Sequence, residues 1–147
     1  MLTASEANLL RILIVDDSTH VRRALRTCLE LTPNWEVCGE AESGQAGIEM
    51  VRSSKPDVVL LDYAMPGMNG LEAARQIALD APGSVMLLFT MFASDQLAEL
   101  AQSVGVRQVI SKAVGGMGAI VQAIQDSALP PEDQTSGGFS SRREVIP

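Results

Sequence analysis

The chain has 147 residues, 46% of them hydrophobic, and a formal net charge of −7 at pH 7. This length suits one domain with a single sizeable core. The negative charge argues against a basic surface that binds nucleic acid, and the apolar runs are too short for the roughly 18 residues of a membrane span. The start, MLTASEANLL, lacks the basic and apolar regions of a signal peptide, so we expect a cytoplasmic protein. Cys28 and Cys38 are then expected to be reduced, mostly buried thiols.

Five short apolar runs alternate along the chain with five helical patterns. The apolar runs cover residues 11–15, 36–41, 57–61, 84–89 and 107–110. The helical patterns cover residues 18–31, 44–53, 70–80, 94–103 and 116–127. Such alternation predicts right-handed crossovers and a parallel sheet with helices on both faces. We therefore predict an α/β fold with a doubly wound five-stranded sheet.

The last stretch of the chain differs in composition from the rest. From Pro130 it runs PPEDQTSGGFSSRREVIP, which is rich in Pro, Gly and Ser and has no apolar period. This composition predicts a flexible tail or a truncated linker over residues 129–147.

Polar side chains follow four of the five predicted strands. The first strand ends in Asp16 and Asp17, the third in Asp62, the fourth in Thr90, and the fifth leads to Lys112. In open parallel sheets, ligands bind beyond these carboxyl ends. Three converging carboxylates would raise one another's pKa unless a cation such as Mg²⁺ offset them. A phosphoryl group arriving on Asp62 would meet that cation, the Lys112 ammonium and the Thr90 hydroxyl, so we interpret Asp62 as a nucleophile.

Each of these residues also has a simpler interpretation when it is taken alone. Asp17 or Ser18 could cap the following helix, and Asp62 could begin a turn. Thr90 and Lys112 could be a strand-end hydroxyl and a solvated lysine. Their shared position at one edge of one sheet favours the combined site.

Two other features of the first predicted helix are interpreted structurally. His20 has no partner histidine or cysteine at ligand spacing, so we expect a residue on the helix surface. The arginines Arg22, Arg23 and Arg26 favour a solvated helix face, with a docking patch as the alternative.

The segments ILIVDDS, PDVVLLDYAMPGMNGLEAARQI and LLFT, followed by Lys112, resemble the receiver domain of two-component response regulators. The likeness covers residues 9–128. The segments EVCGEAESGQAGIEMV and SKAVGGMGAIVQAI are similar to the NarL/FixJ class. The resemblance implies a flavodoxin-like sheet of strand order 2-1-3-4-5.

The resemblance also implies a role for each residue of the predicted site. Asp62 would be the phosphoacceptor, with Thr90 as the switch hydroxyl and Lys112 in contact with the phosphoryl group. The implied Mg²⁺ ligands are the side chains of Asp16, Asp17 and Asp62 and the backbone carbonyl of Ala64.

Partners follow from the same resemblance. A sensor histidine kinase or a phosphotransfer protein would donate the phosphoryl group. A downstream protein, or an output domain after residue 147, would respond to the changed surface, and homodimer formation on phosphorylation is left open. Direct contact of this chain with nucleic acid or membrane is not expected. The only chemistry expected is its own phosphoryl transfer and dephosphorylation.

Three departures from the family pattern leave alternatives open. Val109 replaces the usual switch aromatic, Met91 replaces a small side chain, and the loop 113–118 is rich in glycine. The alternative function is a receiver-like binding module that works without phosphorylation. A phosphatase acting on small molecules is disfavoured because Ala64 occupies the place of its general acid.

Overall fold

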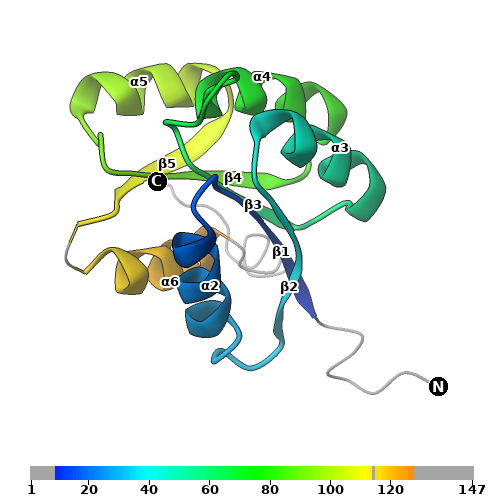
Figure 1. Cartoon of the computed structure of the whole chain (residues 1–147). Coiled ribbons are helices and arrows are strands. Elements are labelled where there is room, and N and C mark those ends of the chain that lie inside the picture. The colour runs from blue at the N-terminus through cyan, green and yellow to red at the C-terminus, as the bar shows by residue number, and fades with distance from the viewer. Residues whose placement is uncertain (1–8, 114, 128–147) are drawn as a thin grey trace, which may run out of the picture.

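The computed structural model describes residues 9–113 and 115–127, and helices alternate strictly with strands in this part of the chain (Figure 1). The strands are β1 (Leu10–Val15), β2 (Trp35–Ala41), β3 (Val58–Leu61), β4 (Val85–Thr90) and β5 (Val106–Ser111). The helices are α2 (Thr19–Leu29), α3 (Gly44–Ser54), α4 (Gly70–Asp80), α5 (Asp95–Ser103) and α6 (Gly116–Ser127). All bounds lie within two residues of the predicted ones. The predicted tail, 129–147, lies outside the described residues.

The five strands form one parallel sheet in the order β2-β1-β3-β4-β5, which confirms the predicted doubly wound, flavodoxin-like fold. The uninterrupted apolar runs explain why β1 and β3 are central strands, because β3 is buried along its whole length and β1 from Ile12 onward. In the register of the sheet, Val15 is paired with Leu61. The residues that follow these two, Asp16 and Asp62, therefore emerge side by side.

Helices α3, α4 and α5 cover one face of the sheet, and α2 and α6 cover the other (Figure 1). Side chains of β1 alternate between the two layers, with Leu13 and Val15 on the α3 side and Ile12 and Ile14 on the α2 side. Each fully buried aliphatic side chain contributes about 1.5 to 3 kcal/mol of stability. Among the described residues, no helix is long and apolar enough for a membrane crossing.

Helices α2, α3, α4 and α5 each follow the loop after a strand. A side chain caps the first turn of each of these four helices. The cap oxygen accepts a backbone N–H from three residues further on, which satisfies a donor that the helix leaves free. These caps are Ser18, Ser43, Asn69 and Ser94. The loops between strand ends and helices are therefore held in defined positions.

Candidate functional site

The three aspartates predicted to form a site lie together at the carboxyl edge of the sheet. One carboxylate oxygen from each of Asp16, Asp17 and Asp62 lies within 4.8 Å of the other two. Asp16 and Asp62 are only 2% and 5% exposed, whereas Asp17 is open to solvent. Oxygen ligands with one side open to water suit a hard divalent cation that keeps part of its hydration shell. The donor set thus fits Mg²⁺.

Lys112 is not the solvated lysine of the simpler interpretation. Its Nζ lies 2.7 Å from Asp16 Oδ2 and 3.4 Å from Asp62 Oδ1, and its side chain is largely buried. The backbone N–H of Lys112 donates to the carbonyl of Thr90 at 2.9 Å, which ties the end of β5 to that of β4. The ammonium is therefore held between two buried carboxylates, with a third nearby.

The pKa of the Asp62 carboxyl is raised above its ordinary value. Burial is the main cause, and the negative charge of Asp16 adds to it. The Lys112 ammonium and the backbone N–H of Ala64 act in the opposite direction without cancelling the shift. A second positive charge at this position would favour the ionised carboxylate.

The carboxyl end of β4 contributes the hydroxyl of Thr90, which already accepts a hydrogen bond. Thr90 is fully buried, and its Oγ1 accepts the backbone N–H of Phe92 at 3.1 Å. Met91 and Phe92 follow, and these residues are 67% and 61% exposed. Val109, in place of an aromatic residue, is partly buried against the α3-side core.

The loop after Asp62 depends on a glycine to which the sequence analysis gave no role. A Cβ added at Gly70 would lie 2.3 Å from the carbonyl oxygen of Asp62 and 2.9 Å from Cα of Tyr63. The backbone N–H of Gly70 donates to the Tyr63 carbonyl at 2.8 Å. Asn69 caps α4 through a capping box with Glu72. Only a residue without a side chain allows this close return of the chain.

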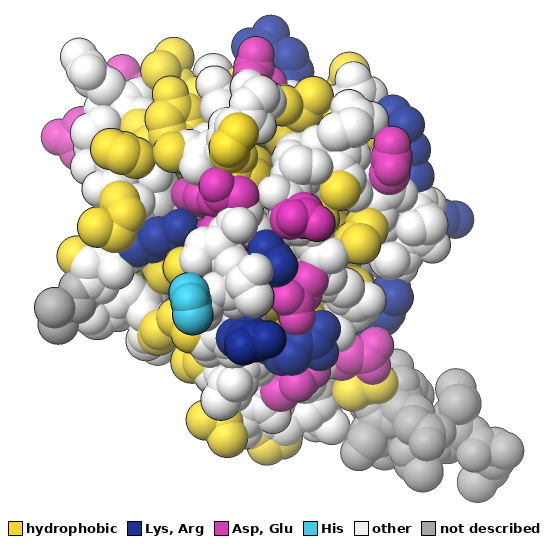
Figure 2. All heavy atoms as spheres, in the orientation of Figure 1, with side chains coloured by type: hydrophobic (Ala, Val, Ile, Leu, Met, Phe, Trp, Pro, Cys, Tyr) yellow, Lys and Arg dark blue, Asp and Glu magenta, His cyan; other side chains and the backbone are white. Residues whose placement is uncertain are grey.

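The arginines of α2 form the expected solvated face only in part. Arg22 and Arg26 both pair with Glu40 of β2, through their Nε atoms at 3.0 Å and 2.7 Å. The prediction is wrong for Arg22, whose side chain is only 14% exposed, whereas the Arg26 side chain remains 39% exposed and Arg23 is exposed as expected. Basic and acidic side chains lie interleaved on the face shown in Figure 2. Hydrogen bonds from Arg26 and then Arg22 lower the pKa of Glu40, despite partial burial.

Two other predictions for single residues can be compared with the structure. His20 is exposed on α2, in agreement with the structural interpretation. Cys28 and Cys38 are free thiols, but they are partly rather than mostly buried. Burial raises the pKa of the Cys38 thiol, which disfavours its thiolate.

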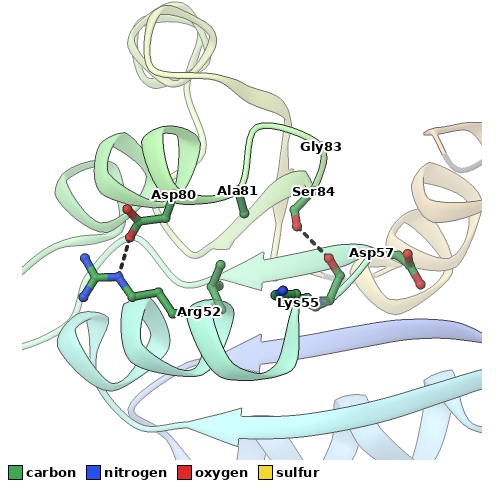
Figure 3. A pocket seen from close by; sticks show the side chains of 9 residues that line it. Arg52, Lys55, Asp57, Asp80, Ala81, Gly83 and Ser84 are labelled. Atoms are coloured by element: carbon green, nitrogen blue, oxygen red, sulfur yellow. Dashed lines mark hydrogen bonds and ion pairs between the residues drawn. The ribbon is translucent and has the colours of Figure 1, made fainter.

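A hollow of about 330 Å³ lies between the C-terminal parts of α3 and α4, at the opposite edge of the sheet (Figure 3). Three of its charged groups are already partnered, since Arg52 Nε pairs with Asp80 at 2.8 Å and Asp57 accepts the backbone N–H of Arg11 at 2.8 Å. Ser84 donates to the Pro56 carbonyl at 2.6 Å. These contacts hold neighbouring segments of the chain together. At the other edge of the sheet, in contrast, three carboxylates lie near the single ammonium of Lys112.

Residues 12–125 match the family model described as the response regulator receiver domain. The chain belongs to this family. A protein-glutamate methylesterase/protein-glutamine glutaminase of Pyrococcus abyssi is 47% identical to this receiver over 79 residues, which are 54% of this chain and 22% of the relative. The response regulator GacA of Pseudomonas viridiflava is 33% identical over 117 residues, 80% of this chain and 54% of the relative.

Solved structures support the same family. A two-component response regulator of the LuxR family from Aurantimonas sp. SI85-9A1 is 31% identical with a TM-score of 0.77, over 81% of this chain and 84% of that one. The resemblance to receivers of two-component systems, including the NarL/FixJ type, is confirmed. Phosphorylation-dependent switching is the standard function of this family. The receiver spans 22% to 54% of the length of the two curated relatives.

Proposed function

We propose that this receiver accepts a phosphoryl group on Asp62 from a sensor histidine kinase or a phosphotransfer protein. The carrying observation is the nearly buried Asp62 carboxylate, which shares a 4.8 Å cluster with Asp16 and Asp17 and lies 3.4 Å from the Lys112 ammonium. Mg²⁺ would be held by these three aspartates and the backbone carbonyl of Ala64. It would neutralise charge that develops on the phosphoryl oxygens.

The residues of the chain have separate tasks in this transfer. A carboxylate oxygen of Asp62 attacks phosphorus in line, and the bond from phosphorus to the donor imidazole nitrogen breaks. The imidazole leaves with the bonding electrons and takes up a proton, so that an acyl phosphate remains. Lys112 already lies between Asp16 and Asp62, so a small shift would bring its ammonium to a phosphoryl oxygen.

The hydroxyl of Thr90 supplies the link to the surface. It accepts the Phe92 N–H in the structure, and turning toward a phosphoryl oxygen would break this bond. The β4–α5 loop would then move, and a downstream partner or an output domain would respond to the altered surface. The only reactions that we propose for this chain are the phosphorylation and dephosphorylation of the receiver itself.

Incubation with acetyl phosphate and Mg²⁺, followed by intact-mass analysis, tests the proposal. We expect one added phosphoryl group in the wild type, none without a divalent cation and none in Asp62→Asn. Asp126→Asn, an exposed aspartate on α6, is the matched control and should be labelled like the wild type. Labelling of Asp62→Asn at the wild-type rate would refute the assignment. A folded wild type that is never labelled would favour the phosphorylation-independent binding module.

A further inference from the structure

The backbone carbonyl of Asp16 accepts a hydrogen bond from an arginine that is itself ion-paired with a glutamate. The proposed phosphoryl transfer uses neither contact. Arg22 Nη1 donates to the carbonyl oxygen of Asp16 at 2.6 Å. The same guanidinium pairs through Nε with Glu40 Oε1 at 3.0 Å. The Arg22 side chain is 14% exposed, and that of Glu40 is 27% exposed. The hydrogen bond from Arg22 to the Asp16 carbonyl is therefore partly shielded from water. A charge-assisted hydrogen bond is strong in such surroundings.

Every other polar group of Asp16 also has a partner. Its N–H donates to the Ala41 carbonyl at 3.0 Å. Its Oδ1 accepts the Ser18 N–H at 2.8 Å, and its Oδ2 accepts from Lys112 at 2.7 Å. Arg22 satisfies the remaining group, the carbonyl. This carbonyl belongs to the peptide that joins Asp16 to Asp17, so its direction determines where the Asp17 backbone begins.

A β-bulge explains why Glu40 can reach Arg22. The register between β1 and β2 shifts between Ile12, which pairs with Val37, and Leu13, which pairs with Gly39. Strict alternation from Val37 would direct Glu40 toward the α3 side. The extra residue reverses the alternation, so that Glu40 is paired with Ile14 and faces α2.

We propose that Arg22, oriented by Glu40, is a positioning residue that fixes the Asp16–Asp17 peptide for divalent-cation binding by the Asp17 carboxylate. A guanidinium presents its donors in one rigid plane, so a contact at Nε also sets the direction of Nη1. A lysine has a single ammonium on a flexible stem and cannot hold both partners in this geometry. This inference rests on the cation-binding part of the proposed function.

Arg26 provides a matched control within the same network. It pairs with Glu40 at 2.7 Å and with Glu30 at 3.4 Å. Arg22 is the arginine of this pair that donates to Asp16. Removal of Arg26 should therefore cost charge and stability without releasing the Asp16–Asp17 peptide.

Two measurements test the proposal without phosphorylation. The first is the Mg²⁺ dissociation constant from calorimetric titration, and the second is amide exchange of Ser18 in the metal-free protein. We expect Arg22→Met to weaken Mg²⁺ binding about tenfold, the scale seen when a group that orients a ligand is removed. Exchange at Ser18 should accelerate, because its acceptor belongs to the released aspartate. Arg26→Met should leave both quantities within about twofold of the wild type.

Further variants separate positioning from a general loss of stability. Arg22→Lys keeps the charge and should not restore affinity. Glu40→Gln should weaken binding in the same direction, and the double variant Arg22→Met with Glu40→Gln should bind no more weakly than Arg22→Met alone. Thermal unfolding of every variant identifies those that fail to fold. If Arg22→Met is one of them, the Mg²⁺ affinity of Arg22→Lys tests the proposal instead.

Three results would overturn the positioning role: unchanged Mg²⁺ affinity in both Arg22 variants, an equal loss in Arg26→Met, or no Mg²⁺ binding by the wild type. Neither the Mg²⁺ affinity nor the amide exchange of Ser18 depends on whether Asp62 accepts a phosphoryl group. Failure of Asp62 to accept one would reject the proposed function and leave the positioning role standing.

Discussion

The ammonium of Lys112 donates to the Asp16 carboxylate at 2.7 Å, although the two residues are 96 positions apart in the chain. The same ammonium lies 3.4 Å from the buried Asp62. One cation thus faces two buried carboxylates, and Asp17 adds a third from the solvent side. This excess of negative charge disfavours the folded state until a proton or a cation offsets it.

Asp62→Asn should stabilise the metal-free protein near neutral pH by about 1 kcal/mol, the size of a common single-residue effect. The raised pKa of Asp62 means that the folded state binds its proton more tightly than the unfolded chain does. The carboxyl therefore supports the fold below its unfolded pKa, and this support is lost as pH rises through its folded pKa. Thermal unfolding without metal should show the gap between variant and wild type widening with pH. A less stable variant at neutral pH would contradict the charge excess.

Glu40→Gln should destabilise the protein at neutral pH by about 1 kcal/mol, because two arginines lose their ionised partner. The pKa of Glu40 is lowered, so its contribution is present above the unfolded pKa and is lost as pH falls through the folded pKa. Urea unfolding at neutral and acidic pH should therefore show the difference shrinking on acidification. Glu49→Gln, on the exposed surface of α3, is the control and should have little effect at either pH.

Gly70→Ala should cost about 3 kcal/mol, at the upper end of overpacking effects, since the atoms 2.3 Å and 2.9 Å from the new Cβ belong to the backbone. The same change should slow labelling of Asp62, because the carbonyl that must move is its own. The control is Gly118→Ala in α6, where an added Cβ meets nothing within 4 Å. Alanine favours helix over glycine there by up to about 1 kcal/mol. Equal stability of the two variants would show that the loop after Asp62 adapts.

The acyl phosphate should persist longer than in receivers with amide or acidic side chains beside the site. Hydrolysis requires a water in line behind phosphorus, and neither Ala64 nor Phe92 can hold one by hydrogen bonding. The double substitution Ala64→Asn with Phe92→Glu should shorten the lifetime about tenfold, which corresponds to roughly 1.4 kcal/mol of barrier. Decay after removal of the donor measures this. An unchanged lifetime in the double variant would mean that water positioning does not control hydrolysis.

The sequence alone was sufficient to predict the layers of the fold and the edge of the site. Uninterrupted apolar runs mark strands buried on both faces, and alternation with helices restricts their connection to a parallel sheet. Asp16 and Asp62 each follow such a run, so any register that aligns β1 with β3 brings them together. These conclusions needed only the local pattern and general rules of chain topology.

Tertiary structure decided which charged groups are partners. Whether Lys112 is solvated or held by Asp16 depends on how β5 is placed beside β4, which no local pattern records. The contact of Glu40 with Arg22 depends on a bulge that reverses the direction of side chains along β2. The need for glycine at position 70 arises from a close approach to the Asp62 carbonyl. Each of these relations joins separate segments at atomic distance, whereas periodicity in a sequence specifies only which face of its own element a residue occupies.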